Sequence, residues 1–187
     1  MYRTYIALLA VSLLACQSKT GQQQTNPQQS SSQYDGNVSL LVSNEKGMNE
    51  QAPNFTWLDE NGTRVSFAEF SKGKPVLINF WATWCGPCVR EIPDLIALNE
   101  EYAAKGALII GISADRDDNV LALVSGFAKE HNINYQIVID NGNLEGAFGG
   151  LQGYPTTFYI NKDGKIVKTL IGMQSKEKFA QELNAIL

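Results

Sequence analysis

The stretch Asn79-Phe-Trp-Ala-Thr-Trp-Cys-Gly-Pro-Cys88 joins an apolar segment to two cysteines that are separated by two residues. The segment Val76-Leu-Ile-Asn-Phe-Trp81 is almost continuously apolar, which predicts a central β-strand covered on both faces. A helix is expected to follow from Gly86 to Lys105, ended by Gly106. The cysteines therefore lie at the junction between a strand and a helix.

These two cysteines have the spacing that thiol-disulfide exchange requires. Exchange needs a thiolate that attacks and a second thiol that can close on the same sulfur, and two intervening residues put both cysteines in one helical turn. Unpaired N–H groups at the helix start favour the first cysteine as a thiolate, and Pro87 is tolerated in that first turn. Cys85 is therefore the expected nucleophile and Cys88 the resolving thiol.

Two non-catalytic interpretations of the cysteine pair, a stabilising disulfide and half of a zinc site, have less support than catalysis. A stabilising disulfide would close a loop so short that it gains little from loop-closure entropy. Half of a zinc site would need a second cysteine pair or histidines, and the chain has three cysteines and one histidine in all. The cysteines therefore indicate catalysis, and no metal site is expected.

Strands alternate with helices along the rest of the chain. Further strands are expected at Ala107–Ile112, Gln136–Ile139, Thr157–Ile160 and Ile166–Ile171, and further helices at Asp117–His131 and after Ser175 as N-cap. Two segments around Asp59-Glu-Asn-Gly62, namely Phe55–Leu58 and Thr63–Phe67, predict an N-terminal β-hairpin. This order predicts an α/β fold with a central mixed sheet and helices on both faces.

The composition limits the function classes. With 187 residues the chain has room for one domain and an appendage, and 44% hydrophobic residues can form a compact core. The net charge of -4 argues against nucleic acid as a principal partner. A single histidine, His131, makes a histidine metal cluster or a Ser-His-Asp triad improbable.

The N-terminus has the features of a secretion signal. Residues 1–15 carry one charge, Arg3, followed by an apolar run from Ile6 to Ala15 that is broken only by Ser12. The run is about half the roughly 20 residues that a spanning helix needs. Leu13-Leu-Ala-Cys16 resembles the lipobox of bacterial lipoproteins, which implies that residues 1–15 are a signal peptide and that Cys16 is lipidated. A plain secreted protein remains the alternative.

A polar segment separates Cys16 from the pattern of strands. Gln, Ser and Asn dominate residues 17–37, which cannot bury enough apolar surface to offset their ordering entropy. Residues 16–49 are therefore expected to form a disordered tether, and residues 50–187 the folded domain. Within the tether, Val38–Val42 could form a short strand or remain an apolar patch, and the sequence does not decide between them.

At the two cysteines the chain resembles the active site of the thioredoxin superfamily. Pro93 matches the proline inside that family's first active-site helix, and Gly153-Tyr-Pro-Thr156 resembles its cis-proline loop. The resemblance implies a thioredoxin-like fold with a cis Tyr154–Pro155 bond beside the disulfide. It also implies a substrate-binding surface made of Trp84, Gly86, Pro87, Tyr154, Pro155 and Thr156, with no cofactor besides the redox-active Cys85–Cys88 disulfide.

A finer resemblance is to the membrane-tethered thiol-disulfide reductases of cytochrome c maturation, the TlpA/ResA-like branch. It is carried by Ala52-Pro-Asn-Phe-Thr-Trp57, by Gly73-Lys-Pro-Val-Leu-Ile-Asn-Phe-Trp81 and by a helix and strand inserted between Ser113 and Pro155. It implies an extracytoplasmic reductase of protein disulfides that faces the periplasm or the cell exterior. Apocytochrome c is then a candidate substrate and a membrane protein the expected electron donor.

One position departs from thioredoxin. The buried aspartate that thioredoxin has six residues before its first cysteine is replaced here by Asn79, which cannot accept the proton of Cys88. Glu91 lies three residues after Cys88, on the same helix face, and the tethered branch has a glutamate with this role. Glu91 is therefore a candidate proton acceptor; the alternative is a solvated glutamate favoured by the helix dipole.

Three other functions are compatible with the fold. A thiol peroxidase of the peroxiredoxin type would have a threonine three residues before its reactive cysteine, where this chain has Ala82. A copper chaperone would need a wider cysteine spacing and a positioned histidine. A non-catalytic binding module would not need both cysteines.

The direction of electron flow depends on the relative stability of the dithiol and disulfide forms, which the sequence does not give.

Overall fold

The computed structural model describes residues 34–47 and 49–187. The predicted signal peptide, Cys16 and residues 17–33 of the predicted tether lie outside the described residues. Within the described ranges, no helix combines the length and the apolar character that crossing a bilayer requires.

The described residues form a mixed sheet of nine strands with the order β4-β3-β2-β7-β6-β5-β8-β9, and β1 pairs with β2 outside this row. The strands are β1 (Tyr34–Asp35), β2 (Val38–Glu45), β3 (Asn54–Leu58), β4 (Arg64–Ser66), β5 (Val76–Trp81), β6 (Leu108–Ser113), β7 (Gln136–Ile139), β8 (Thr156–Ile160) and β9 (Ile166–Ile171). Four neighbours, β2, β7, β6 and β5, run parallel, and β8 and β9 continue the sheet antiparallel.

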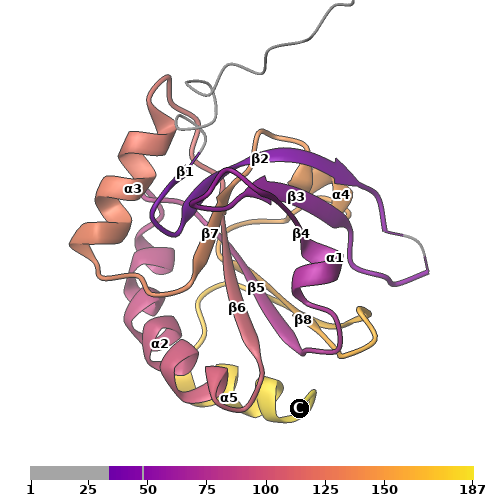
Figure 1. The fold of residues 1–187 in the computed structure, drawn as a ribbon. Coiled ribbons are helices and arrows are strands. Elements are labelled where there is room, and N and C mark those ends of the chain that lie inside the picture. The colour runs from indigo at the N-terminus through magenta and orange to yellow at the C-terminus, as the bar shows by residue number, and fades with distance from the viewer. Residues whose placement is uncertain (1–33, 48) are drawn as a thin grey trace, which may run out of the picture.

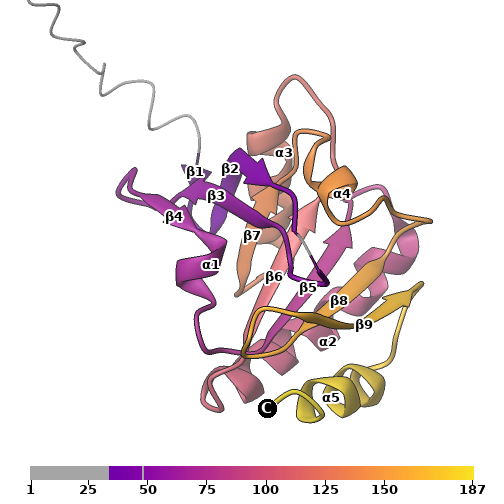
Figure 2. The ribbon, with the colours of Figure 1, turned by 90° about the vertical axis from the view of Figure 1, so that its right-hand side faces the viewer.

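The helices cover both faces of this sheet. They are α1 (Phe67–Phe70), α2 (Gly86–Ala103), α3 (Val120–Glu130), α4 (Leu144–Ala147) and α5 (Lys176–Asn184). Figures 1 and 2 show α2, α3 and α5 on one side of the sheet and α1 and α4 on the other. The α/β fold with a central mixed sheet, an N-terminal hairpin and an inserted helix and strand, α3 and β7, is confirmed.

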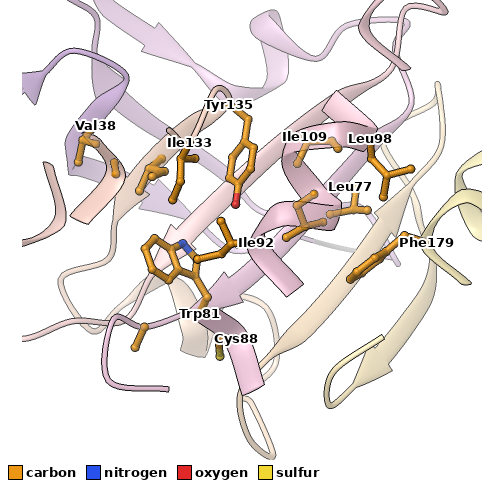
Figure 3. Close-up of a cluster of buried hydrophobic side chains, with 14 of the residues drawn as sticks. Val38, Leu77, Trp81, Cys88, Ile92, Leu98, Ile109, Ile133, Tyr135 and Phe179 are labelled. Carbon is orange, nitrogen blue, oxygen red and sulfur yellow. The ribbon is translucent and has the colours of Figure 1, made fainter. Parts of the chain in front are cut away.

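Each face of the sheet has its own apolar core. All six side chains of β5 are buried, as expected for a central strand between two layers. Leu77 and Trp81 point to the side of α2, α3 and α5, where they pack with Ile92, Leu98 and Phe179 (Figure 3). Ile78 and Phe80 point to the opposite core, beneath the hairpin and α4. The end of β5, which leads into the cysteine-bearing turn, is thus packed on both sides.

The N-terminal boundary of the domain differs from the prediction. Part of the expected disordered tether forms β1 and β2. The strand β2 inserts between β3 and β7 and pairs antiparallel with β3 and parallel with β7. Val38 is 1% exposed, so Val38–Val42 is a strand of the sheet. The local composition does not indicate this strand, because β2 is stabilised by hydrogen bonds to β3 and to β7, which lies far along the chain.

Other boundaries are close to prediction. The cysteine-bearing helix α2 starts at Gly86 as expected, and Ser175 caps α5 by accepting a hydrogen bond from the Lys178 amide at 3.3 Å. The helix α3 starts three residues later than expected, at Val120 in place of Asp117. Phe67, expected at the end of a strand, starts α1. The short helix α4 is not among the elements that the sequence predicts.

Candidate active site

The two cysteines form a disulfide at the start of α2. The S–S distance is 2.06 Å and the Cα atoms are 5.2 Å apart. Cys85 is the N-cap residue, with Pro87 in the first turn, and its sulfur accepts a hydrogen bond from the Cys88 amide at 3.3 Å. An N–H donor directed at this sulfur would stabilise a thiolate formed there on reduction.

The two sulfur-bearing residues differ in accessibility. Cys85 is 6% exposed and Cys88 is fully buried. Beside them, Trp84 is 67% exposed and is the most exposed large apolar residue among the described ones, while Gly86 and Pro87 are also exposed. An incoming protein can therefore contact Trp84 and reach Cys85 before Cys88.

The loop before β8 lies beside the disulfide-bearing turn. The Tyr154–Pro155 bond is cis, as the resemblance predicts. The ring of Trp84 meets the ring of Tyr154 edge to face, with 5.8 Å between centroids. Thr156 is buried and its hydroxyl donates to the Gly153 carbonyl at 2.6 Å. Within the described chain, the backbone groups of Tyr154 make no hydrogen bond, so they can pair with an extended substrate segment.

Glu91 is a buried residue. It is 1% exposed, so the interpretation of Glu91 as a solvated helix residue is wrong. Its carboxylate accepts a hydrogen bond from Asn79 Nδ2 at 2.8 Å and another from the Gln174 amide at 3.1 Å. Asn79 Nδ2 also donates to Thr157 Oγ1 at 3.1 Å. The carboxyl group is thus held between α2, β5 and the loop that follows β9.

This environment changes the acidity of Glu91. Burial raises the pKa of its carboxyl from 4.5 to about 7, because the charged form loses hydration. The hydrogen bonds from Gln174 and Asn79 oppose part of this rise, and the negative charge of Asp94 adds to it. A carboxyl group with a pKa near 7 can both take up and release a proton at neutral pH.

Trp81, the other tryptophan of the stretch that carries the cysteines, lies away from the surface. Trp81 is 1% exposed and belongs to the core, where its Nε1 and the hydroxyl of Tyr135 lie without a hydrogen-bond partner among the described residues. Figure 3 shows both side chains in the cluster that also holds Cys88. Trp84 therefore belongs to the surface of the site and Trp81 to its packing.

Sequence reasoning missed several residues that shape the site. The sequence shows Asn79 only as the replacement of an aspartate, whereas in the structure its side-chain amide donates to Glu91. Gln174 could not have been found, because its contribution is a backbone amide that any residue except proline provides. Glu145, on the unpredicted helix α4, accepts a hydrogen bond from the Tyr154 hydroxyl at 2.6 Å.

Comparison with known proteins agrees with this geometry. The AhpC/TSA family matches residues 48–169. The thiol-disulfide oxidoreductase ResA of Bacillus thuringiensis subsp. konkukian is 37% identical over 137 residues, which cover 73% of this chain and 77% of that protein. ResA of Bacillus subtilis is 32% identical over 135 residues, covering 72% and 73% of the two chains.

A solved structure is similar to this chain in both fold and sequence. The thiol:disulfide interchange protein of Chlorobium tepidum TLS superposes with a TM-score of 0.65 at 30% identity, covering 76% of this chain and 99% of the other. The chain therefore belongs to the AhpC/TSA family, and within it this protein is a thioredoxin-fold thiol-disulfide oxidoreductase.

Proposed function

We propose that this protein is an extracytoplasmic, lipid-anchored reductase of protein disulfides. The observation that carries the proposal is the Cys85–Cys88 disulfide at a helix start, with a buried carboxyl group one turn further along that helix. The Cys-Gly-Pro-Cys sequence and the similarity to ResA favour the direction in which the protein gives electrons to its substrate.

The proposed reaction starts from the dithiol form. The Cys85 thiolate attacks a substrate disulfide, so that a Cys85–substrate disulfide forms and one substrate thiolate leaves. Cys88 then loses its proton and attacks the sulfur of Cys85, which releases the second substrate thiolate. Two electrons pass to the substrate, and the Cys85–Cys88 disulfide remains.

Glu91 is the proposed acceptor of the Cys88 proton. Both residues are buried on one face of α2, three positions apart, where bulk water has poor access. With a pKa of about 7, the carboxyl is partly ionised at neutral pH and can take up the proton when Cys88 attacks. Asn79 and Gln174 hold the carboxylate in place through their hydrogen bonds.

The proposed location follows from the N-terminal sequence. Cleavage before Cys16 and lipidation of its thiol would hold the domain at a membrane that faces the periplasm or the cell exterior. A membrane protein would then restore the dithiol, and apocytochrome c is a candidate substrate. Mass spectrometry of the mature N-terminal peptide tests this assignment: an unmodified Cys16 or a retained segment 1–15 would contradict it.

Trapping experiments test the chemistry. The Cys88→Ser variant should accumulate a mixed disulfide with a protein substrate through Cys85, because the resolving thiol is gone. The Cys85→Ser variant should accumulate none, since Cys88 is fully buried. Equal trapping by the two variants would contradict the assigned roles.

A second assay tests the reaction class. The pre-reduced wild-type protein should reduce the disulfides of insulin faster than it consumes hydrogen peroxide, because Ala82 stands where a peroxiredoxin has its threonine. Rapid peroxide consumption without insulin reduction would instead favour a thiol peroxidase.

A further inference from the structure

Trp84 and Tyr154, the aromatic pair beside the disulfide, belong to a closed ring of contacts. On one side, Thr83 precedes Trp84 and is bound to the buried carboxylate of Asp115. The Thr83 amide donates to Asp115 Oδ2 at 3.0 Å, and its hydroxyl donates to Oδ1 at 2.6 Å. The Ser113 hydroxyl donates to Asp115 Oδ2 at 2.9 Å. The chain before Trp84 is thereby attached to the end of β6.

On the other side, the ring continues through Arg116 and Glu145. Arg116 Nη1 donates to the carbonyl of Asp115 at 3.0 Å, and Nη2 lies 3.4 Å from Glu145 Oε1. The same Glu145 oxygen accepts the hydrogen bond of the Tyr154 hydroxyl at 2.6 Å. Tyr154 then meets Trp84 edge to face, which closes the ring.

A buried carboxylate fixes the helix that carries Glu145. Asp140 has a fully buried side chain and accepts hydrogen bonds from the Leu144 amide at 2.9 Å and from the Glu145 amide at 3.4 Å. Its Oδ2 also pairs with Arg116 Nη2 at 3.2 Å. Arg116 and Glu145 themselves remain partly exposed, with side chains at 44% and 26%. The carboxylates of Asp115 and Asp140 that anchor the ring are thus buried, whereas Arg116 and Glu145 reach the surface.

We propose that Glu145 is a positioning residue for protein substrates, which holds Tyr154, and through it Trp84, in the orientation that receives an extended segment carrying the target disulfide. This inference rests on the proposed reduction of protein disulfides. Among the described residues the backbone groups of Tyr154 have no hydrogen-bond partner, and the ring of Trp84 is exposed. The hydrogen bond from the Tyr154 hydroxyl to Glu145 joins this docking surface to α4. Prior fixation of the two rings lowers the ordering cost of binding.

The expected substrates follow from this geometry. A protein segment that pairs with the Tyr154 backbone and covers the Trp84 ring binds more tightly when the two rings are already fixed in orientation. A small disulfide such as hydroxyethyl disulfide needs only access to Cys85, so the orientation of the rings changes its binding little. Glu145 should therefore affect the ratio of kcat/KM for a protein disulfide to kcat/KM for a small disulfide.

The test measures that ratio in single-turnover reactions of the pre-reduced protein with excess insulin or hydroxyethyl disulfide, in which the limiting rate and the half-saturating concentration take the place of kcat and KM. Glu145→Ala should lower the ratio by about tenfold, mainly through a higher KM for insulin, as expected when a hydrogen bond to a charged group is lost. Glu145→Gln should keep most of the wild-type ratio, because its amide oxygen can still accept the hydrogen bond from the tyrosine hydroxyl. Glu60→Ala, at an exposed residue of the distant β3–β4 turn, is the matched control.

A double-mutant cycle shows whether Glu145 acts through Tyr154. Tyr154→Phe removes only the hydroxyl, and Glu145→Ala combined with Tyr154→Phe should lower the ratio no further than either change alone. In protein labelled with 5-fluorotryptophan, the ¹⁹F resonance of Trp84, assigned by its loss in Trp84→Phe, should shift in Glu145→Ala. The resonances of the buried Trp57 and Trp81 should stay in place, which reports that the domain remains folded.

The outcomes separate this inference from the proposed function. If the wild type reduces hydroxyethyl disulfide but not insulin, the protein is not a general reductase of protein disulfides and both proposals fail. If the wild type reduces insulin and Glu145→Ala leaves the ratio unchanged, the positioning role alone is overturned. Additive losses in the double-mutant cycle, or an unshifted Trp84 resonance, would also overturn it.

Discussion

The side-chain amide of Asn79 donates a hydrogen bond to the carboxylate of Glu91, with 2.8 Å between Nδ2 and Oε1. Asn79 belongs to the central strand β5 and Glu91 to the helix that carries both cysteines, so the bond connects the two elements that form the site. The position where thioredoxin has an acid is thus occupied by a donor to an acid supplied by the neighbouring helix. Asn79 favours the ionised form of Glu91, which is the form that can accept a proton.

The first prediction concerns this hydrogen bond. In Asn79→Ala the pKa of Glu91 should rise above its wild-type value of about 7, because a donor that favours the carboxylate is removed while the burial stays. The exchange rate relative to wild type should then fall at pH 7 and recover as the pH is raised. Carbon-13 NMR titration of the glutamate carboxyl groups measures the pKa, and stopped-flow exchange measures the rate.

Asn99→Ala is the matched control for this prediction. Asn99 lies on α2, the helix that carries Glu91, and donates to the Asn134 carbonyl at 3.1 Å. The hydrogen-bond partners of Glu91 within the described chain are Asn79 and Gln174. This variant should keep the wild-type titration. A Glu91 pKa that is equal in Asn79→Ala and in wild type would show that the hydrogen bond does not act on the acidity of the site.

The second prediction is a pH dependence of stability in the oxidised protein. The pKa of Glu91 is 4.5 when solvated and about 7 in the fold, so between these values the native state keeps a proton that the unfolded state has lost. The free energy of unfolding therefore falls as the pH rises from about 4.5 to about 7, by an amount on the order of 3 kcal/mol from this group. Urea unfolding at a series of pH values measures it.

Glu91→Gln should remove this part of the pH dependence, because glutamine does not titrate. Glu100→Gln, which changes an exposed glutamate on the same helix, should keep the wild-type slope. Equal slopes in Glu91→Gln and wild type would mean that the carboxyl titrates near its solvated pKa in spite of its burial.

The third prediction concerns catalysis by Glu91. In Glu91→Gln the resolution of the mixed disulfide should slow by roughly 10²-fold, the lower end of what general-base assistance typically contributes. The amide oxygen of glutamine can still accept the bond from Asn79, so the packing is kept while the proton acceptor is lost. Rapid-quench mass spectrometry of the mixed disulfide measures its decay, and Glu100→Gln should decay at the wild-type rate. An unchanged decay in Glu91→Gln would leave Glu91 with a structural role only.

The sequence predicts those parts of the site that depend on neighbours along the chain. The strand β5, the start of α2 and the cysteine spacing all lie within residues 76–88, where apolar run, proline and cysteines give local signals. The cis bond before Pro155 came from a resemblance, because a tyrosine-proline pair alone predicts only a turn. The strand, the helix start and the cysteine spacing could be predicted because each is encoded within a short stretch of sequence.

The burial of Glu91 could not be predicted in this way. A glutamate in the second turn of a helix is ordinarily solvated, and here the loop after β9 covers it with the Gln174 amide, 83 residues away. The ring of contacts through Asp115, Arg116 and Glu145 could not be predicted from the sequence for the same reason, because it joins the ends of β6 and β7 to α4. Contacts of this kind depend on how strands, helices and loops that are far apart in the sequence pack together, and no local sequence pattern indicates that packing.

The fourth prediction tests the N-terminal boundary of the domain. A chain that begins at residue 50 lacks β2 and leaves the edge of β7 and one edge of β3 unpaired, so it should unfold at a much lower urea concentration than a chain that begins at residue 34. In the longer chain, Val38→Ala should cost about 2 kcal/mol, because Val38 is 1% exposed within the core below α3. Ser43→Ala, at an exposed position of the same strand, should cost far less. If the two truncated chains unfolded at the same urea concentration, β2 would contribute nothing to stability, and the domain would begin at residue 50 as its sequence pattern alone indicates.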